Sequence, residues 1–322
     1  MRLKDARSLL FVPATSPHLF RKATERGADA LIIDLEDAVP AARKAEARVL
    51  AAQAIEAMAG TVPLLARVNA PPGLLAADIA SLPLARLQAV LLPKVESVES
   101  IDELADAIAR ATGATSAARV ANVVGATSAA RTMDAARTTD AAGATEAAGP
   151  TAGPPIVALI ESPLGVLRAA DIAAHPALCA LGFGSEDYAT AMQVEPEPGP
   201  LLWAAQKVAV CARAFELACW GLPGSVADIA DVDAFGRLVR QARSIGFTGT
   251  VCIHPRQVAA ANAGFGPSEQ QLAWARKVIA ADDEASAKGL GAVTLDGRMI
   301  DRPIVERARH WLKQAAGQEP AD

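Results

Sequence analysis

Short apolar runs alternate with longer amphipathic segments along most of this 322-residue chain. Each run has the length of one buried strand, and each intervening segment is long enough for a helix. The eight expected strands lie at 8–12, 30–33, 64–68, 89–92, 156–160, 178–183, 225–229 and 250–253. Eight such strands spread over about 250 residues favour an α/β fold, a (β/α)8 barrel of the TIM type, over a doubly wound sheet.

A long helix is expected over 201–219, between the sixth and seventh strands. Trp203, Cys211 and Phe215 recur along it at helical spacing, which indicates a face packed on the core. No GxGxxG motif follows the first strand, which weakens the alternative of a dinucleotide-binding domain.

The chain is expected to form a catalytic barrel over residues 1–257 and a C-terminal helical segment over 258–322. We expect that last segment to serve as a lid and in oligomerisation. Inside the barrel, residues 112–154 are dominated by small residues and contain GATSAAR twice, at 113–119 and 125–131. Low-complexity sequence without apolar periodicity predicts an insertion with no catalytic role, on the helix-to-strand side of the barrel.

Composition limits the partners and the compartment. A formal net charge of −5 gives no support for nucleic acid as a partner. No apolar stretch approaches the ~20 residues that span a bilayer, so no membrane partner is expected. The four cysteines are scattered without a CxxC pair, which is typical of free thiols in a reducing compartment and predicts a cytoplasmic protein.

Charged side chains follow several of the expected strands. The carboxyl ends of barrel strands open on one face, and neighbouring parallel strands lie roughly 4.8 Å apart. Side chains at these ends can therefore converge on one site. The set comprises Asp34, Glu36, Asp37, Arg67, Lys94, Glu161 and Asp187.

Glu161 and Asp187 end adjacent strands and are the expected ligands of one cation. A hard cation held by only two carboxylates keeps positions for water and substrate oxygens, which is typical of Mg²⁺. Arg67 offers a planar fork suited to a substrate carboxylate. A bound metal can polarise an oxo- or hydroxy-acid and stabilise an oxyanion when a carbon–carbon bond breaks, so lyase or aldol-type chemistry is expected.

Two features of this set have other interpretations. The acids at 34–37 could instead cap a helix and occupy its first turn. Lys94 is the only candidate for a Schiff-base lysine, and we expect it rather to pair with the acids and to face the substrate.

Seven motifs, in order, resemble the citrate lyase β-subunit family of the HpcH/HpaI aldolase and malyl-CoA lyase superfamily. The resemblance covers most of the chain apart from the insertion. The motifs are RSLLFVP (7–13), KATERGADALIIDLEDAVP (22–40), RVN (67–69), LPKVES (92–97), LIESPLGV (159–166), LGFGSEDY (181–188) and GFTGTVCIHPRQV (246–258).

The resemblance implies roles for the strand-end residues. The family's Mg²⁺ ligands fall on Glu161 and Asp187, where Glu161 also contacts the substrate, and its substrate-carboxylate arginine falls on Arg67. Glu36 and Asp37 would stand near the metal and hold water.

The resemblance also implies sites for coenzyme A and for an acid/base. Arg7 and Lys22 match positions beside the CoA phosphates. GRMIDRPIVERA at 297–308 resembles the lid motif of CoA-ester lyases, whose aspartate, here Asp301, reaches into a neighbouring subunit's site. A helix cap before Pro303 is the alternative for this residue, and the two roles are compatible.

The implied function is an Mg²⁺-dependent lyase that splits a β-hydroxyacyl-CoA of the malyl, citramalyl or citryl type into an oxo-acid and an acyl-CoA by retro-Claisen chemistry. If Asp301 acts in a neighbouring subunit, a homotrimer or hexamer is expected. Two alternatives stay open. The chain could be the β-subunit of a citrate lyase complex acting on a thioester of an acyl carrier protein, or a non-catalytic ligand-binding or assembly protein.

Overall fold

The computed structural model describes residues 3–113, 153–287, 289 and 293–316. The predicted insertion at 112–154 falls almost entirely outside these ranges. The chain divides into two compact units, Met1–Asn262 and Ala263–Asp322.

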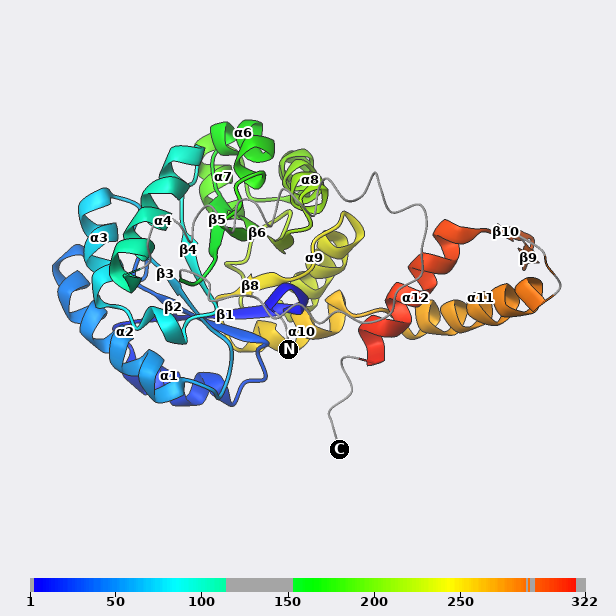
Figure 1. Ribbon diagram of the computed structural model, residues 1–322, viewed down its shortest axis with the longest axis horizontal. Coiled ribbons are helices and arrows are strands. Elements are labelled where there is room, and N and C mark those ends of the chain that lie inside the picture. The colour runs from blue at the N-terminus through cyan, green and yellow to red at the C-terminus, as the bar shows by residue number, and fades with distance from the viewer. Residues whose placement is uncertain (1–2, 114–152, 288, 290–292, 317–322) are drawn as a thin grey trace. The chain divides into compact units, whose positions relative to one another are not determined.

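The described part of the first unit holds one sheet of eight parallel strands (Figure 1). The strands are β1 (Ser8–Pro13), β2 (Ala30–Asp34), β3 (Leu64–Arg67), β4 (Ala89–Leu92), β5 (Ile156–Ile160), β6 (Leu178–Phe183), β7 (Ala218–Gly221) and β8 (Thr250–Cys252). Their hydrogen-bonded order is β7-β6-β5-β4-β3-β2-β1-β8. A parallel bridge between Trp220 and Gly249 joins the two ends, and the predicted barrel is thereby confirmed.

Helices connect the strands and surround them (Figure 1). Their buried residues recur at helical spacing, as do Ile101, Leu104 and Ile108 in α4. The α-helices are α1 (Pro17–Thr24), α2 (Lys44–Met58), α3 (Pro72–Ser81), α4 (Val98–Thr112), α6 (Pro163–Ala173), α7 (Ser185–Met192), α8 (Pro198–Ala214), α9 (Val232–Ser244) and α10 (Arg256–Phe265). Short 3-10 turns lie at η1 (Leu3–Asp5), η2 (Ala41–Arg43) and η3 (Leu84–Arg86).

The seventh strand was predicted in the wrong place. The helix expected over 201–219 ends at Ala214, and β7 follows at Ala218–Gly221, whereas 225–229 lies in a loop. Glu216 has a backbone φ of +57°, so the chain turns out of the helix one residue before Leu217. The four-residue run Ala-Cys-Trp-Gly is too short for periodicity to distinguish it from the end of an apolar helix.

Part of the helix face that was expected to pack on the core is exposed. Trp203 and Phe215 are 59% and 44% exposed, while Val208 and Cys211 on the same helix are buried. The apolar face of α8 that contacts the barrel is therefore narrower than the sequence suggested.

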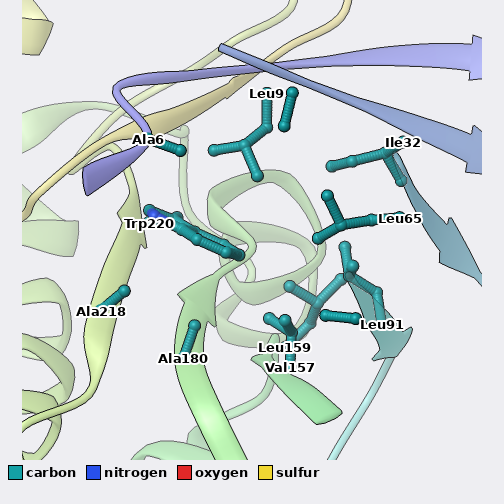
Figure 2. Packing of buried hydrophobic residues seen from close by; sticks show 12 residues of the cluster. Ala6, Leu9, Ile32, Leu65, Leu91, Val157, Leu159, Ala180, Ala218 and Trp220 are labelled. Carbon is teal, nitrogen blue, oxygen red and sulfur yellow. The ribbon is translucent and has the colours of Figure 1, made fainter. Parts of the chain in front are cut away.

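The barrel interior is mostly aliphatic, as the aromatic content of 4% requires. Trp220 on β7 is the large exception and is 2% exposed. Its ring extends into the middle of the barrel and packs in one cluster with Leu9, Leu65 and Leu159 (Figure 2). This single ring fills volume that small residues such as Ala180 and Ala218 leave open.

The second unit has its own core. Helices α11 (Glu269–Ala287) and α12 (Arg302–Ala316) pack on each other, and the antiparallel hairpin β9 (Val293–Leu295) and β10 (Arg298–Ile300) connects them. Among the helices of the described residues, none combines the length and the apolar character that crossing a bilayer requires.

Candidate active site at the carboxyl ends of the strands

Arg67 lies at the end of β3 and forms a bidentate ion pair with Asp34 at the end of β2. Its Nε and Nη2 donate to the two carboxylate oxygens of Asp34 at 2.8 and 2.7 Å. Its Nη1 lies 3.0 Å from Glu36 Oε2, and its guanidinium lies over the Phe11 ring at 4.7 Å. Burial disfavours the Arg67 cation, but the hydrogen bond to Asp34 and the nearby carboxylates outweigh burial and raise its pKa.

Asp34 also organises the turn that follows β2. Its carboxylate accepts hydrogen bonds from the backbone N–H of Glu36 at 2.9 Å and of Ala38 at 3.2 Å. Asp34 is 1% exposed. The alternative of a helix cap is wrong for this stretch, because η2 begins only at Ala41 and α2 at Lys44, and neither has a side-chain cap. The Asp34 carboxylate instead holds a turn and an arginine.

Lys94, just after β4, connects this group to Glu161. Its backbone N–H donates to Glu161 Oε2 at 2.8 Å, and its Nζ donates to Glu36 Oε1 at 2.8 Å. The hydrogen bond to Glu36 is the largest cause that raises the pKa of Lys94. A lysine that stays cationic suits a charge partner of the acids, and not the amine of a Schiff base.

Glu161 follows β5 and is 7% exposed. Burial raises the pKa of its carboxyl to about 7; the Lys94 N–H opposes this rise, and the charge of Asp187 adds to it. Asp187 lies in the first turn of α7. The Asp187 charge raises the pKa of both Glu161 and Lys94, so Asp187 lies near both groups. The residues that follow β6 therefore belong to the same site.

This donor set fits Mg²⁺. Five carboxylates face only two cationic side chains, so the cluster carries an excess of negative charge: Asp34, Glu36, Asp37, Glu161 and Asp187 against Arg67 and Lys94. Within the described residues, no three His, Cys, Asp or Glu side chains converge to hold an ion. A site with only two protein carboxylates suits a cation that keeps several waters.

A cavity of about 590 Å³ opens beside the cluster. Both charged and apolar residues line it. Lys44 is one of the lining residues, and its position is fixed because its Nζ donates to the backbone oxygens of Leu35 and Glu36 at 2.7 Å each. The lining residues are Glu36, Asp37, Val39, Lys44, Asn69, Ala70, Pro71, Leu74 and Lys94.

Sequence reasoning missed the group that holds the loop after β3. Asn69 donates from its backbone N–H and from Nδ2 to Asp78 Oδ2, at 2.9 and 2.7 Å. Arg48 Nε donates to the other oxygen of Asp78 at 2.7 Å. Asp78 is fully buried on α3, and a carboxylate among apolar helix residues was the only signal that could have identified it.

The neighbouring acids Glu186 and Asp187 have different surroundings. Glu186 Oε1 accepts from Ser225 Oγ at 2.6 Å and from the Val226 N–H at 3.1 Å. Buried Gln257 donates from Nε2 to the Val226 backbone oxygen at 2.8 Å. Glu186 therefore anchors the loop after β7, which explains why Asp187 is the better candidate ligand.

The structure does not bring Arg7 or Lys22 to the cluster. Arg7 precedes β1 and pairs with Asp29 through Nε at 2.9 Å and Nη2 at 3.1 Å, at the amino end of the barrel. Lys22 is exposed in the last turn of α1. Since α1 connects two parallel strands, its last turn also lies toward the amino end. The predicted place of both residues beside the CoA phosphates stays a prediction.

Asp301 belongs to the second unit and immediately precedes α12. Its backbone oxygen accepts from the N–H groups of Ile304 and Val305 at 3.0 Å each. Its side-chain Oδ1 is buried and has no hydrogen-bond partner within the described structure. Helix initiation therefore does not use this oxygen.

Comparison with known proteins finds enzymes that are similar to this chain over nearly its whole length. The chain is 31% identical to the citrate lyase subunit beta of Leuconostoc mesenteroides subsp. cremoris, over 98% of this chain and 95% of that protein. It is 29% identical to the mitochondrial citramalyl-CoA lyase of Rattus norvegicus, over 96% of this chain and 86% of that one.

A solved structure of the CitE protein of Mycobacterium tuberculosis, in complex with magnesium, acetoacetate and coenzyme A, is also similar. It matches with a TM-score of 0.71 and 27% identity, over 98% of this chain and all of that one. The family model described as HpcH/HpaI aldolase/citrate lyase matches residues 7–255. The predicted resemblance is confirmed, and the chain belongs to the HpcH/HpaI aldolase/citrate lyase family.

Proposed function

We propose that this protein is an Mg²⁺-dependent carbon–carbon lyase that cleaves a β-hydroxyacyl-CoA into an oxo-acid and an acyl-CoA. The observation that carries the proposal is the convergence of Glu161, Asp187 and Arg67 at the carboxyl ends of the strands. Relatives similar over nearly the whole chain support it, since one is a citramalyl-CoA lyase and another was solved with magnesium and coenzyme A.

Each residue at the carboxyl ends of the strands has its own role in the proposed reaction. Glu161 and Asp187 would hold Mg²⁺, which supplies a Lewis acid for the hydroxyl and carboxylate oxygens of the substrate. Arg67 binds that carboxylate with the N–H groups that Asp34 leaves free. Glu36 and Asp37 hold the water that accepts the hydroxyl proton. Lys94 favours the ionised form of both acids; it opposes the rise that burial causes in the pKa of Glu36, and it helps to lower the pKa of Asp37.

Bond cleavage leaves an electron pair on the α-carbon of the acyl-CoA. We assign protonation of this carbon to Asp301 of a neighbouring subunit, as in the lid motif it resembles. Its buried Oδ1 without a partner supports a role outside the second unit's own fold. This assignment requires a homo-oligomer, for which we propose a trimer or hexamer. The four free cysteines support a cytoplasmic location.

A second candidate is the β-subunit of a citrate lyase complex, which would act on a thioester of an acyl carrier protein. The 31% identity to a citrate lyase subunit beta favours it. A non-catalytic binding protein is the weaker alternative, because an excess of carboxylates around two cations costs stability unless it is used.

The test is an assay of the purified chain with malyl-, citramalyl- and citryl-CoA, following glyoxylate, pyruvate and oxaloacetate. We expect turnover of at least one thioester with Mg²⁺, none with EDTA, and none for Glu161→Gln. Activity only on the acyl-carrier thioester, with co-purification of a carrier subunit, would select the second candidate. Inactivity on every thioester with Mg²⁺ present would contradict both.

A further inference from the structure

The β6–α7 turn passes unusually close to the Glu161 side chain. A Cβ atom built on Gly184 would overlap Glu161 Oε1, and it would lie 2.6 Å from the Cγ and 2.9 Å from the Cδ of Glu161. Real Cβ atoms do not approach other heavy atoms this closely. A side chain at position 184 and the present position of the Glu161 carboxylate therefore exclude each other.

The backbone conformation of Gly184 does not itself require glycine. Its φ of −91° and ψ of 93° lie in a region that other residues adopt. Its amide donates to the Ile160 backbone oxygen at 3.0 Å, a bond that alanine would also make. The contact with Glu161 is thus the local reason for glycine at this position.

The other face of the carboxylate is fixed by Lys94. Its backbone N–H donates to Glu161 Oε2, and it does so from a left-handed conformation with φ +56°. A non-glycine residue in this region is strained by about 1 kcal/mol or more. One oxygen of Glu161 is therefore held by the loop after β4, while the turn after β6 borders the other.

We propose that Gly184 is a positioning residue for Glu161, and that its missing side chain and the Lys94 backbone together fix the carboxylate where it can bind a cation. The inference rests on the proposed function only in its last step, the binding of Mg²⁺. The placement of the carboxylate is a property of the metal-free protein and can be tested separately.

Gly184→Ala is the direct test. The colliding atoms are the far end of a flexible side chain, so the variant is expected to fold with the Glu161 carboxylate rotated away from the Lys94 N–H. Mg²⁺ affinity by titration calorimetry should fall about 10- to 100-fold, the range for disturbed ligand positioning. Gly199→Ala is the matched control, because a Cβ there meets nothing within 4 Å, and it should bind as the unmodified protein does.

Crystal structures of the metal-free variants make the test independent of the proposed function. An unmoved Glu161 carboxylate in Gly184→Ala, or unchanged Mg²⁺ affinity, would overturn the positioning role. If the unmodified protein bound no Mg²⁺, the proposed function would fail, while the metal-free structures would still decide where the carboxylate lies.

A second variant covers the case in which Gly184→Ala does not fold. Glu161→Ala removes the colliding atoms, so the double variant Gly184→Ala/Glu161→Ala should fold as well as Glu161→Ala alone. The losses of thermal stability of the two single variants should therefore not add up in the double variant, which marks two residues that act through one contact. Strictly additive losses of thermal stability would place the effect of Gly184 elsewhere.

Discussion

Arg67 enters the site with much of its hydrogen-bonding capacity already used by the protein. Its Nε edge is closed by Asp34, and Glu36 approaches Nη1. The Phe11 ring covers one face of the guanidinium. A substrate carboxylate can therefore be met only in the plane and direction that Asp34 imposes, which makes Asp34 a determinant of substrate orientation.

Replacing Asp34 by Asn should weaken both folding and substrate binding. The pair with Arg67 is buried, so the free energy of unfolding should fall by about 3 kcal/mol in urea titrations. KM should rise more than kcat falls, because the arginine remains but is no longer oriented. The exposed Arg43–Glu46 pair gives the control, and Glu46→Gln should lower the free energy of unfolding far less than Asp34→Asn does, because solvent screens this pair. Equal losses for the two variants would contradict the buried role.

Glu161 makes the stability of the metal-free protein depend on pH. Its carboxyl has a folded pKa of about 7, raised chiefly by burial from 4.5, so the folded state binds its proton more tightly than the unfolded chain. The stabilisation is complete below the unfolded pKa and is lost as pH rises through 7. With EDTA, this group should reduce the free energy of unfolding by up to about 3 kcal/mol between pH 4.5 and 8.

Mg²⁺ should reverse this loss, because it needs the ionised carboxylate. The Mg²⁺-induced rise in Tm should be larger at pH 8 than at pH 5.5, where the proton competes for Glu161. Glu161→Gln should flatten both dependences in thermal melts. An equal Mg²⁺-induced rise at both pH values, for the unmodified chain, would be inconsistent with Glu161 as a ligand.

At the level of strands and loops, the site depends on short connections held from outside the barrel. The loop after β3 carries Asn69 into the cavity wall and is tied to α3 and α2 through Asp78 and Arg48. The loop after β7 is tied to α7 through Glu186. Side chains on the helical layer thus keep the strand-end loops in place.

Asp78→Ala should loosen one of these loops and leave the other unchanged. Hydrogen exchange of the peptide covering 64–75 should accelerate, since the Asn69 N–H loses its acceptor. A peptide covering 222–231 should exchange as before, because Glu186 and Gln257 hold it independently. Unchanged protection of the first peptide would show that Asp78 does not hold the loop.

Sequence predicted those parts of the fold and the site that follow from local pattern. Glu161 and Asp187 could be paired in advance because the ends of adjacent parallel strands must meet at one edge. Asp78 could not be identified, because its partners Arg48 and Asn69 come from other elements and leave no periodic signal. The position of β7 could not be predicted for a related reason: the strand is short, and only its pairing with β6 distinguishes it from the end of a helix.

For the assembled molecule, the central question is whether one chain completes the site of another. Asp301→Asn and Glu161→Gln should each be inactive alone. Co-expressed, they should regain activity if Asp301 acts in a neighbouring subunit, because roughly one site in four combines an intact barrel with an intact lid in a random mixture. The double variant Asp301→Asn/Glu161→Gln, co-expressed with Glu161→Gln, should stay inactive, because no subunit then carries an intact Glu161. Absence of recovery in mixed oligomers of proven composition would contradict action between subunits.

The indole of Trp220, described above as filler of the barrel, is also an optical reporter of the first unit. Its Nε1 is buried without a hydrogen-bond partner, so its emission should be blue-shifted in the folded barrel and move to the red on unfolding. The second unit carries its own reporters, because the rings of Trp274 and Trp311 lie 5.7 Å apart and each lies near the Arg307 guanidinium, at 5.5 and 5.6 Å. In a Trp203→Phe background, replacing Trp274 and Trp311 leaves the emission of Trp220, which reports the melting of the first unit. Replacing Trp220 instead leaves the emission of the second unit. Comparing the two melting curves shows whether the units unfold together.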